Sequence, residues 1–190
     1  MKLIGSTTSP FVRRIKLLTN NHPIKFVDID IFSEQGADML SANNPARKVP
    51  VLQDGDVTIY DSRVIFNYLI DKLSLPEMTW QQQNLLTIID AANDSLVSIL
   101  LCQRSGFDIT EDKLFFNLQH QRVENVLLAL AKQVENKAFD EWHYPSICLF
   151  CLLDWALFRN LAQWQHIAPL NQFYQHALTQ SLVKETDPRI

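Results

Sequence analysis

A serine in front of a predicted helix, Ser9, is a candidate for binding an anion. Ser9 is followed by Pro10, and apolar residues then recur at helical spacing from about Phe11 to Asn20. The first amides of a helix lack partners within it, and its positive end favours an anion, to which the Ser9 hydroxyl can donate a hydrogen bond. Thr7 and Thr8 are nearby alternatives. An ordinary N-cap serine before a proline explains the same pattern, so both interpretations stay open.

A second polar pair precedes another predicted helix. Apolar residues recur at helical spacing from Arg63 to Leu73, directly after Asp61 and Ser62. The Ser62 hydroxyl and the first helical amides can bind a carboxylate, while Asp61 can pair with an ammonium group. Capping of the helix by either residue is the alternative. Lys48, with Arg47 beside it, can pair with a further carboxylate, and a solvated surface charge is the other interpretation.

The cysteines and histidines do not suggest a metal or redox centre. Cys148 and Cys151 form a C-x-x-C pair inside an apolar run, without a second pair or a histidine at ligand spacing, so we interpret them as buried small side chains. Cys102 makes the cysteine count odd, which argues against a disulfide framework and fits a reducing compartment. Nothing near residue 1 indicates export. We therefore predict no metal and a cytoplasmic location.

The charge balance and the apolar runs exclude two kinds of partner. The chain has 17 basic and 21 acidic residues, a net charge of −4, so it shows no electrostatic footprint for nucleic acid or an anionic membrane. The longest dense apolar stretch, Ile147 to Phe158, is interrupted by Asp154 and is shorter than the roughly 20 residues that cross a bilayer. We predict neither a nucleic-acid partner nor a membrane span.

The elements that must position the polar residues change in kind near Pro76. Before it, short strand-like and helical patterns follow one another in the order strand, helix, strand, helix, strand, strand, helix. Asp54-Gly55 can take the positive φ angles of a tight turn, so the last two strands are predicted to be antiparallel neighbours. The predicted strands are Lys2–Gly5, Ile24–Ile31, Val49–Gln53 and Val57–Tyr60, with a weak helix at Ser33–Leu40.

After Pro76 the apolar period is helical throughout. Thr79 and Gln82 form a capping-box pattern before a long helix, and Thr110, with two acidic residues after it, is predicted to open the next one. Pro145 and Pro169 can each occupy the first position of two further helices, the earlier of which is apolar nearly all round and is predicted to be central. We predict an α/β domain over residues 1–75 and an all-helical domain over residues 80–190.

Three motifs in this order and spacing resemble those of the cytosolic glutathione S-transferases, particularly bacterial members with an S-P-F-V-R opening. They are Ser9–Arg14, Asn44–Leu52 and Tyr60–Ile65, and the ending Gln180–Pro188 is also similar to the family's terminal pattern. The resemblance covers essentially the whole chain. It implies a thioredoxin-like first domain that binds glutathione, followed by a helical bundle.

The resemblance also implies a role for each polar residue. Ser9 would donate to the glutathione thiolate and lower the pKa of the thiol, and because serine cannot form a mixed disulfide, thiol-disulfide exchange is not expected. Val49-Pro50 would form a cis peptide bond, with the backbone of Val49 turned toward the ligand. Asp61 and Ser62 would bind the γ-glutamyl end. Lys48 would bind the glycyl carboxylate.

The sequence departs from the family at three places. Arg47 stands where glycine is frequent, Asp61 stands where glutamate is common, and His143–Ser146 lacks the usual reciprocal capping box of the central helix. The enzyme interpretation is attack of the glutathione thiolate on a small apolar electrophile. A non-catalytic regulator that binds a protein partner, similar to the stringent-starvation proteins, is the alternative.

The resemblance and the long apolar helix that follows Thr79 together predict a homodimer. The pocket for the electrophile is expected in the helical domain. We expect its lining to include Ile99, Cys102, Gln103 and Phe107.

Overall fold

The computed structural model describes residues 1–190. The chain forms two compact units, one made of Met1–Glu77 with Ser181–Ile190 and the other of Met78–Gln180. The last ten residues therefore differ from the expected division, which placed them in the helical domain. They lie in the first unit because Arg13 binds Thr186 and Val183 through buried hydrogen bonds.

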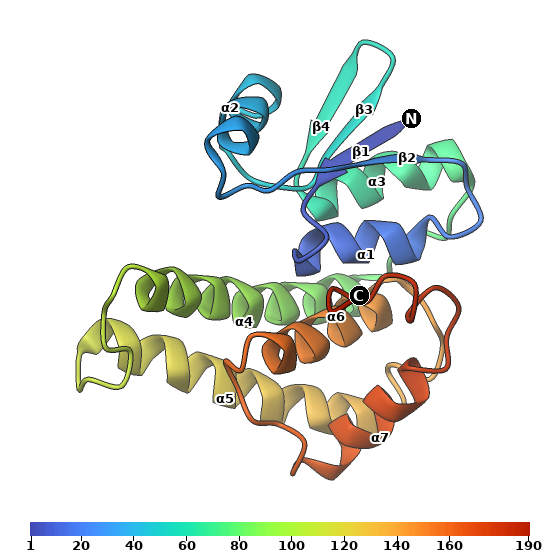
Figure 1. Ribbon diagram of the computed structural model, residues 1–190. Coiled ribbons are helices and arrows are strands. Elements are labelled where there is room, and N and C mark those ends of the chain that lie inside the picture. The colour runs from blue at the N-terminus through green and yellow to red at the C-terminus, as the bar shows by residue number, and fades with distance from the viewer. The chain divides into compact units, whose positions relative to one another are not determined.

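The first unit is built on a four-stranded sheet (Figure 1). The strand order is β2-β1-β3-β4, in which β1 pairs with β2 in parallel and the other two pairings are antiparallel. The strands are β1 (Lys2–Gly5), β2 (Lys25–Asp28), β3 (Val51–Asp54) and β4 (Val57–Tyr60), and the helices are α1 (Pro10–Leu18), α2 (Glu34–Asn43) and α3 (Ser62–Leu73).

Helices cover both faces of this sheet. On one face, Ile4 and Val51 form an apolar cluster with Leu40 of α2. On the other face, a Cβ at Gly5 would come within 2.4 Å of the Val12 side chain, so only glycine allows α1 to lie this close to β1. Helix α1 packs against α3 on the same side (Figure 1). This arrangement is the predicted α/β, thioredoxin-like architecture.

The β3-β4 hairpin has the predicted tight turn. Gly55 has a φ of 58°, and Asp54 pairs with Val57 across the turn. Tyr68 of α3 donates a 2.7 Å hydrogen bond to the Asp54 carboxylate, and Lys72 lies 3.0 Å from it. The hydrogen bond from Tyr68, followed by that from Lys72, holds the pKa of Asp54 below its ordinary value. These contacts fix the hairpin to α3.

The second unit contains only helices. The Thr79–Gln82 capping box is present, and the predicted central helix is buried from Tyr144 through Ala156, including both cysteines of the C-x-x-C pair. Helix α4 packs against α5 and α6, and α7 packs against α5 and α6. The four helices are α4 (Trp80–Arg104), α5 (Leu114–Glu135), α6 (Tyr144–Phe158) and α7 (Ala168–Ala177).

The predicted start of the second long helix at Thr110 is wrong. Helix α5 begins at Leu114, after an N-cap residue, Lys113, whose side chain makes no capping bond. Thr110 instead forms a local turn, since its amide and its hydroxyl both bind Asp108 Oδ1, at 2.9 and 2.6 Å. Threonine supports such turns as readily as caps, and a sequence pattern does not distinguish the two.

Helix α6 begins with a histidine cap in place of the family's usual box. His143 Nδ1 accepts a 3.2 Å hydrogen bond from the Ser146 amide, and His143 Nε2 lies 3.2 Å from the Ala138 carbonyl. Ser146 Oγ donates to the Glu141 carbonyl at 2.6 Å. With Nδ1 accepting from the Ser146 amide, Nε2 is the ring nitrogen that can donate to the Ala138 carbonyl. The Ser146 amide, one of the orphan amides of this buried helix, thus has a partner although the expected motif is missing.

One helix is long and apolar enough to cross a membrane by length and composition. It is α4, whose most apolar 18-residue window has a mean hydropathy of 1.7. Our prediction of no membrane span from the sequence was based on Ile147–Phe158 and did not consider α4. The core helix of a soluble protein has the same character, and 44% of the α4 window is buried within the protein.

Candidate functional site

The sheet register brings the three predicted site segments to one edge of the first unit. Ile4 of β1 pairs with Val51 of β3, which in turn pairs with Tyr60 of β4. From this row, β1 leads into the loop before Ser9. Val49-Pro50 comes directly before Val51, and Asp61 comes directly after Tyr60. The strands therefore place these segments next to one another although up to about 50 residues of sequence separate them.

Ser9 is the N-cap of α1. Its Oγ accepts a hydrogen bond from the Val12 amide at 3.3 Å, and its carbonyl accepts one from the Arg13 amide at 3.1 Å. Accepting from Val12 does not use the hydroxyl proton, so the serine can cap the helix and donate to a ligand at the same time. The two interpretations of Ser9 are therefore compatible.

The alternatives to Ser9 are engaged elsewhere. The Thr7 amide donates to Asp28 Oδ1 at 3.0 Å, and the Thr7 hydroxyl donates to Oδ2 at 3.4 Å. The Thr8 hydroxyl lies 3.1 Å from Ser6 Oγ. Asp28 is opposite Gly5 in the parallel β1-β2 register, so it fixes the loop that leads to Ser9.

A half-buried lysine lies on the same helix. Burial is the largest effect on Lys16 and lowers the pKa of its ammonium group below the ordinary value, against the opposing charge of Asp28. The ammonium lies 4.4 Å from the centroid of the Phe26 ring. Lys16 thus contacts α1 and β2 neighbours rather than the edge where the predicted segments meet.

The loop before β3 is held by Asn44, which is 2% exposed. Asn44 Oδ1 accepts from the Ala46 amide at 2.9 Å, its Nδ2 donates to the Lys48 carbonyl at 2.7 Å, and its backbone carbonyl accepts from the Arg47 amide at 2.9 Å. One buried side chain therefore fixes the backbone on both sides of the turn. The Lys48 side chain is exposed and lies directly before Val49.

The Val49-Pro50 bond is cis, as predicted. Val49 is half-buried and contacts the apolar cluster around Ile4 and Leu40. None of the backbone hydrogen bonds outside the helices and strands involves Val49. Its amide and carbonyl thus extend the row of backbone groups at the start of β3, where an extended peptide can pair with them.

Asp61 and Ser62 form the start of α3, one residue earlier than predicted. Asp61 Oδ1 accepts hydrogen bonds from the Arg63 amide at 2.8 Å and from the Val64 amide at 3.3 Å, so the capping interpretation of Asp61 is confirmed. Oδ2 takes no part in these two bonds. Asp61 has a φ of 69° and a ψ of 137°, a backbone conformation that costs a non-glycine residue about 1 to 3 kcal/mol. Ser62 is 3% exposed.

Arg47 occupies a left-handed backbone position, with a φ of 52°. This explains why glycine is frequent there in the family that the motifs resemble. Replacing Arg47 with glycine is expected to raise the free energy of unfolding by about 1 kcal/mol, since a Cβ is disfavoured in this region. Urea unfolding measures the change. Arg47→Ala keeps the Cβ and is the matched control, and an equal gain in both variants would contradict the backbone explanation.

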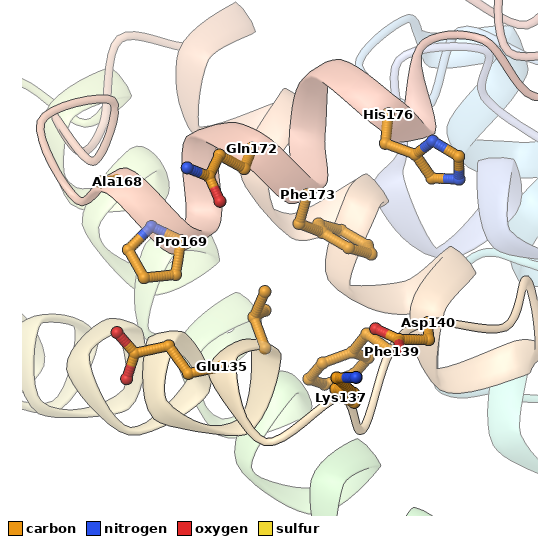
Figure 2. A pocket seen from close by; sticks show the side chains of 10 residues that line it. Glu135, Lys137, Phe139, Asp140, Ala168, Pro169, Gln172, Phe173 and His176 are labelled. Atoms are coloured by element: carbon orange, nitrogen blue, oxygen red, sulfur yellow. The ribbon is translucent and has the colours of Figure 1, made fainter.

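A separate groove lies within the helical unit (Figure 2). It has a volume of about 750 Å³ and contains none of the predicted site residues. Figure 2 shows Asp140 and Lys137 together on one side, Glu135 on the same wall, and Gln172 and His176 on the α7 side. Because acidic and basic side chains are interspersed, the groove does not select a ligand of one charge. We assign no function to this groove.

Two residues that hold the site were not predicted. An Asn-Pro pair is a turn signal, so Asn44-Pro45 could have been assigned as the turn that presents Lys48 and Val49. Asp28 gives no such signal, because its bond to Thr7 depends on the parallel strand register. The four residues predicted to line the electrophile pocket differ in exposure, from the buried Ile99 to Phe107, which is 62% exposed. Their role stays a prediction.

Comparison with known proteins finds similarity to glutathione S-transferases. Residues 3–77 match the family model described as "Glutathione S-transferase, N-terminal domain". The chain is 27% identical over 174 residues to the uncharacterized GST-like protein YibF of Escherichia coli (strain K12), covering 85% of each chain. It is 33% identical to Glutathione S-transferase 4 of Zea mays over 75 residues, which are 38% of this chain and 34% of that one.

Solved structures share the fold over the full length. A glutathione S-transferase from Methylobacillus flagellatus KT with glutathione bound has a TM-score of 0.86 at 22% identity, covering 98% of both chains. A glutathione transferase family member from Pseudomonas fluorescens Pf-5 with bound glutathione has a TM-score of 0.85 at 21% identity, covering 100% of this chain and 99% of that chain. The protein therefore has the glutathione S-transferase fold, as predicted.

Proposed function

We propose that the protein is a glutathione transferase, which binds glutathione at the sheet edge of the first unit and promotes attack of its thiolate on a small apolar electrophile. The observation that carries this proposal is the Ile4–Val51–Tyr60 row, which brings Ser9, Val49-Pro50 and Asp61-Ser62 to one edge. Bound glutathione in two proteins of the same fold supports it.

Each part of glutathione meets a group of matching chemistry. The γ-glutamyl carboxylate binds the Ser62 hydroxyl at the start of α3, where the positive helix end favours an anion. The γ-glutamyl ammonium pairs with Asp61, whose Oδ2 is outside the two capping bonds. The peptide between the γ-glutamyl and glycyl ends pairs with the backbone of Val49, and the glycyl carboxylate pairs with Lys48.

The reaction then needs only a thiolate held beside an electrophile. The cysteinyl thiol loses its proton to solvent, and the Ser9 hydroxyl donates a hydrogen bond to the sulfur, which lowers the pKa of the thiol. The sulfur electron pair forms a bond to an electrophilic carbon, and the leaving group departs with its own electron pair. Proximity and stabilisation of the thiolate supply the rate.

Two departures from the family pattern, Arg47 and Asp61, are compatible with the proposed site. Arg47 takes the left-handed position that a glycine would take, and Asp61 still caps α3. Titration calorimetry with glutathione, followed by a panel of electrophiles, tests the proposal. Binding with conjugation supports it. Binding without conjugation of any electrophile, or no binding, contradicts it and favours the regulator similar to stringent-starvation proteins.

We also propose that two copies of the chain associate. Helix α5 exposes large apolar side chains, among them Leu114 (77%) and Leu118 (45%), and Leu118 borders a groove between α4 and α5 of about 360 Å³ with Ile88 and Val126. Light scattering at micromolar concentration is expected to give twice the chain mass, and Leu118→Glu to lower it. Gln165→Glu, which adds the same charge at an exposed position outside this groove, is the control. A parent mass of 22.0 kDa contradicts the dimer.

A further inference from the structure

The C-terminal segment Ser181–Ile190 is bound to the helix that carries Ser9. Arg13 of α1 is 5% exposed, and its Nε donates to Thr186 Oγ1 at 3.2 Å while its Nη2 donates to the Val183 carbonyl at 2.8 Å. Thr186 and Val183 are buried as well, at 7% and 1% exposure. Asn20, just beyond α1, donates to Ser181 Oγ at 2.8 Å. The segment thus contacts both α1 and the residues just beyond its end.

The bond between Thr186 and Arg13 has a fixed direction. Thr186 Oγ1 donates its only proton within its own segment, to the Leu182 carbonyl at 2.7 Å. A lone pair of the oxygen is left to accept from Arg13 Nε. The local turn of the C-terminal segment therefore orients the acceptor before the helix meets it.

Arg13 also closes the first turn of α1. Its backbone amide donates to the Ser9 carbonyl at 3.1 Å, and the Val12 amide donates to Ser9 Oγ. The helix has nine residues, and isolated helices of this length are marginal in water, so its first turn depends on tertiary contacts. The residue held by the C-terminal segment is the same one that holds Ser9.

We propose that the C-terminal segment positions Ser9 for the glutathione thiolate by anchoring Arg13. The proposal deepens the proposed function and rests on it. Arg13 and Thr186 are positioning residues, since they act through the first turn of α1. Glutathione itself is bound by Lys48–Pro50 and Asp61-Ser62, so a loosened first turn changes the state of the thiol rather than the affinity for the peptide.

The test compares Thr186→Val with Thr186→Ser. Valine matches threonine in shape but has no acceptor, whereas serine keeps it. Thr186→Val is expected to speed hydrogen exchange at the Val12 and Arg13 amides, to raise the pKa of the bound glutathione thiol, and to lower kcat about tenfold, the scale of a small misplacement of a reacting group. The KM of Thr186→Val for glutathione is expected to stay close to that of the parent. Thr186→Ser is expected to match the parent in all of these measurements.

Several results would overturn the proposal. If the parent is active, unchanged hydrogen exchange and an unchanged thiol titration in Thr186→Val contradict it. A loss of glutathione affinity as large as the loss of kcat also contradicts it, because that result indicates a purely structural role. If Thr186→Val does not fold, Arg13→Met, which keeps an unbranched side chain but has no hydrogen-bond donor, carries the same test. An inactive parent would overturn the proposed function, and the exchange rates would then decide the anchoring of α1 by themselves.

Discussion

Replacing Ser9 with alanine is expected to lower the turnover of glutathione conjugation by about a hundredfold, the loss typical of removing one donor to a reacting anion. The Ser9 hydroxyl oxygen accepts a hydrogen bond from the Val12 amide, so its proton can be donated to the thiolate. Without that proton, the pKa of the bound thiol rises and less thiolate is present at neutral pH. Glutathione affinity is expected to change little, because both ends of the peptide are bound elsewhere. Steady-state kinetics and thiolate absorbance titration measure these changes.

A second serine cap provides the control for Ser9→Ala. Ser33 Oγ caps α2 by accepting from the Gly36 amide at 3.0 Å, and Ser33 is not part of the predicted site. Ser33→Ala is expected to cost about 1 kcal/mol of stability, as Ser9→Ala does, without a change in turnover. If Ser9→Ala keeps the turnover and thiol titration of the parent, Ser9 is only a cap, and the role passes to Thr7, Thr8 or a backbone amide.

Cysteine at position 9 gives the opposite change. Ser9→Cys places a thiol at the positive end of α1, where its pKa is lowered. A thiolate can attack a disulfide through a mixed-disulfide intermediate, which a hydroxyl cannot do. The variant is therefore expected to reduce a small mixed disulfide with glutathione as the electron donor, whereas the parent does not. Equal reductase activity in both proteins contradicts the assignment of this position.

Features that depend on neighbouring residues could be predicted from the sequence. The Asp54-Gly55 hairpin, the Thr79–Gln82 capping box and the buried C-x-x-C helix are of this kind, because the turn, cap or apolar period lies within a few residues. The cis bond at Val49-Pro50 was predicted from the family resemblance. Thr110 shows the limit of this approach, since a turn with Asp108 and a helix cap use the same residue types.

Features that depend on strand register could not be predicted. The predicted site segments come together because Ile4, Val51 and Tyr60 lie in one row. The Asp54-Gly55 turn indicates the pairing of Val51 with Tyr60, but no local pattern reveals that Ile4 pairs with Val51. Asp28 reaches Thr7 only through the parallel register of β1 and β2. The bond from Arg13 to Thr186 joins residues 173 positions apart, so the place of the C-terminal segment in the first unit also required the structure.

Replacing Ser62 with alanine is expected to weaken glutathione binding by about 1 to 3 kcal/mol, the range for a buried hydrogen bond to a charged group. Ser62 is 3% exposed at the first position of α3, so a carboxylate that reaches its hydroxyl is largely removed from water. Loss of the hydroxyl leaves that carboxylate with the positive end of α3 alone. Turnover at saturating glutathione is expected to fall less than affinity, because the hydroxyl binds a part of the peptide far from the sulfur.

Titration calorimetry measures the Ser62→Ala effect, with Asn67→Ala as the control. Asn67 is an exposed residue of the same helix and is expected to leave the affinity unchanged. The cap of α3 belongs to Asp61, so Ser62→Ala is expected to alter the affinity without removing the capping bonds to Arg63 and Val64. An affinity equal to that of the parent would remove Ser62 from the site. The γ-glutamyl end would then have to be bound by Asp61 and the positive end of α3 alone.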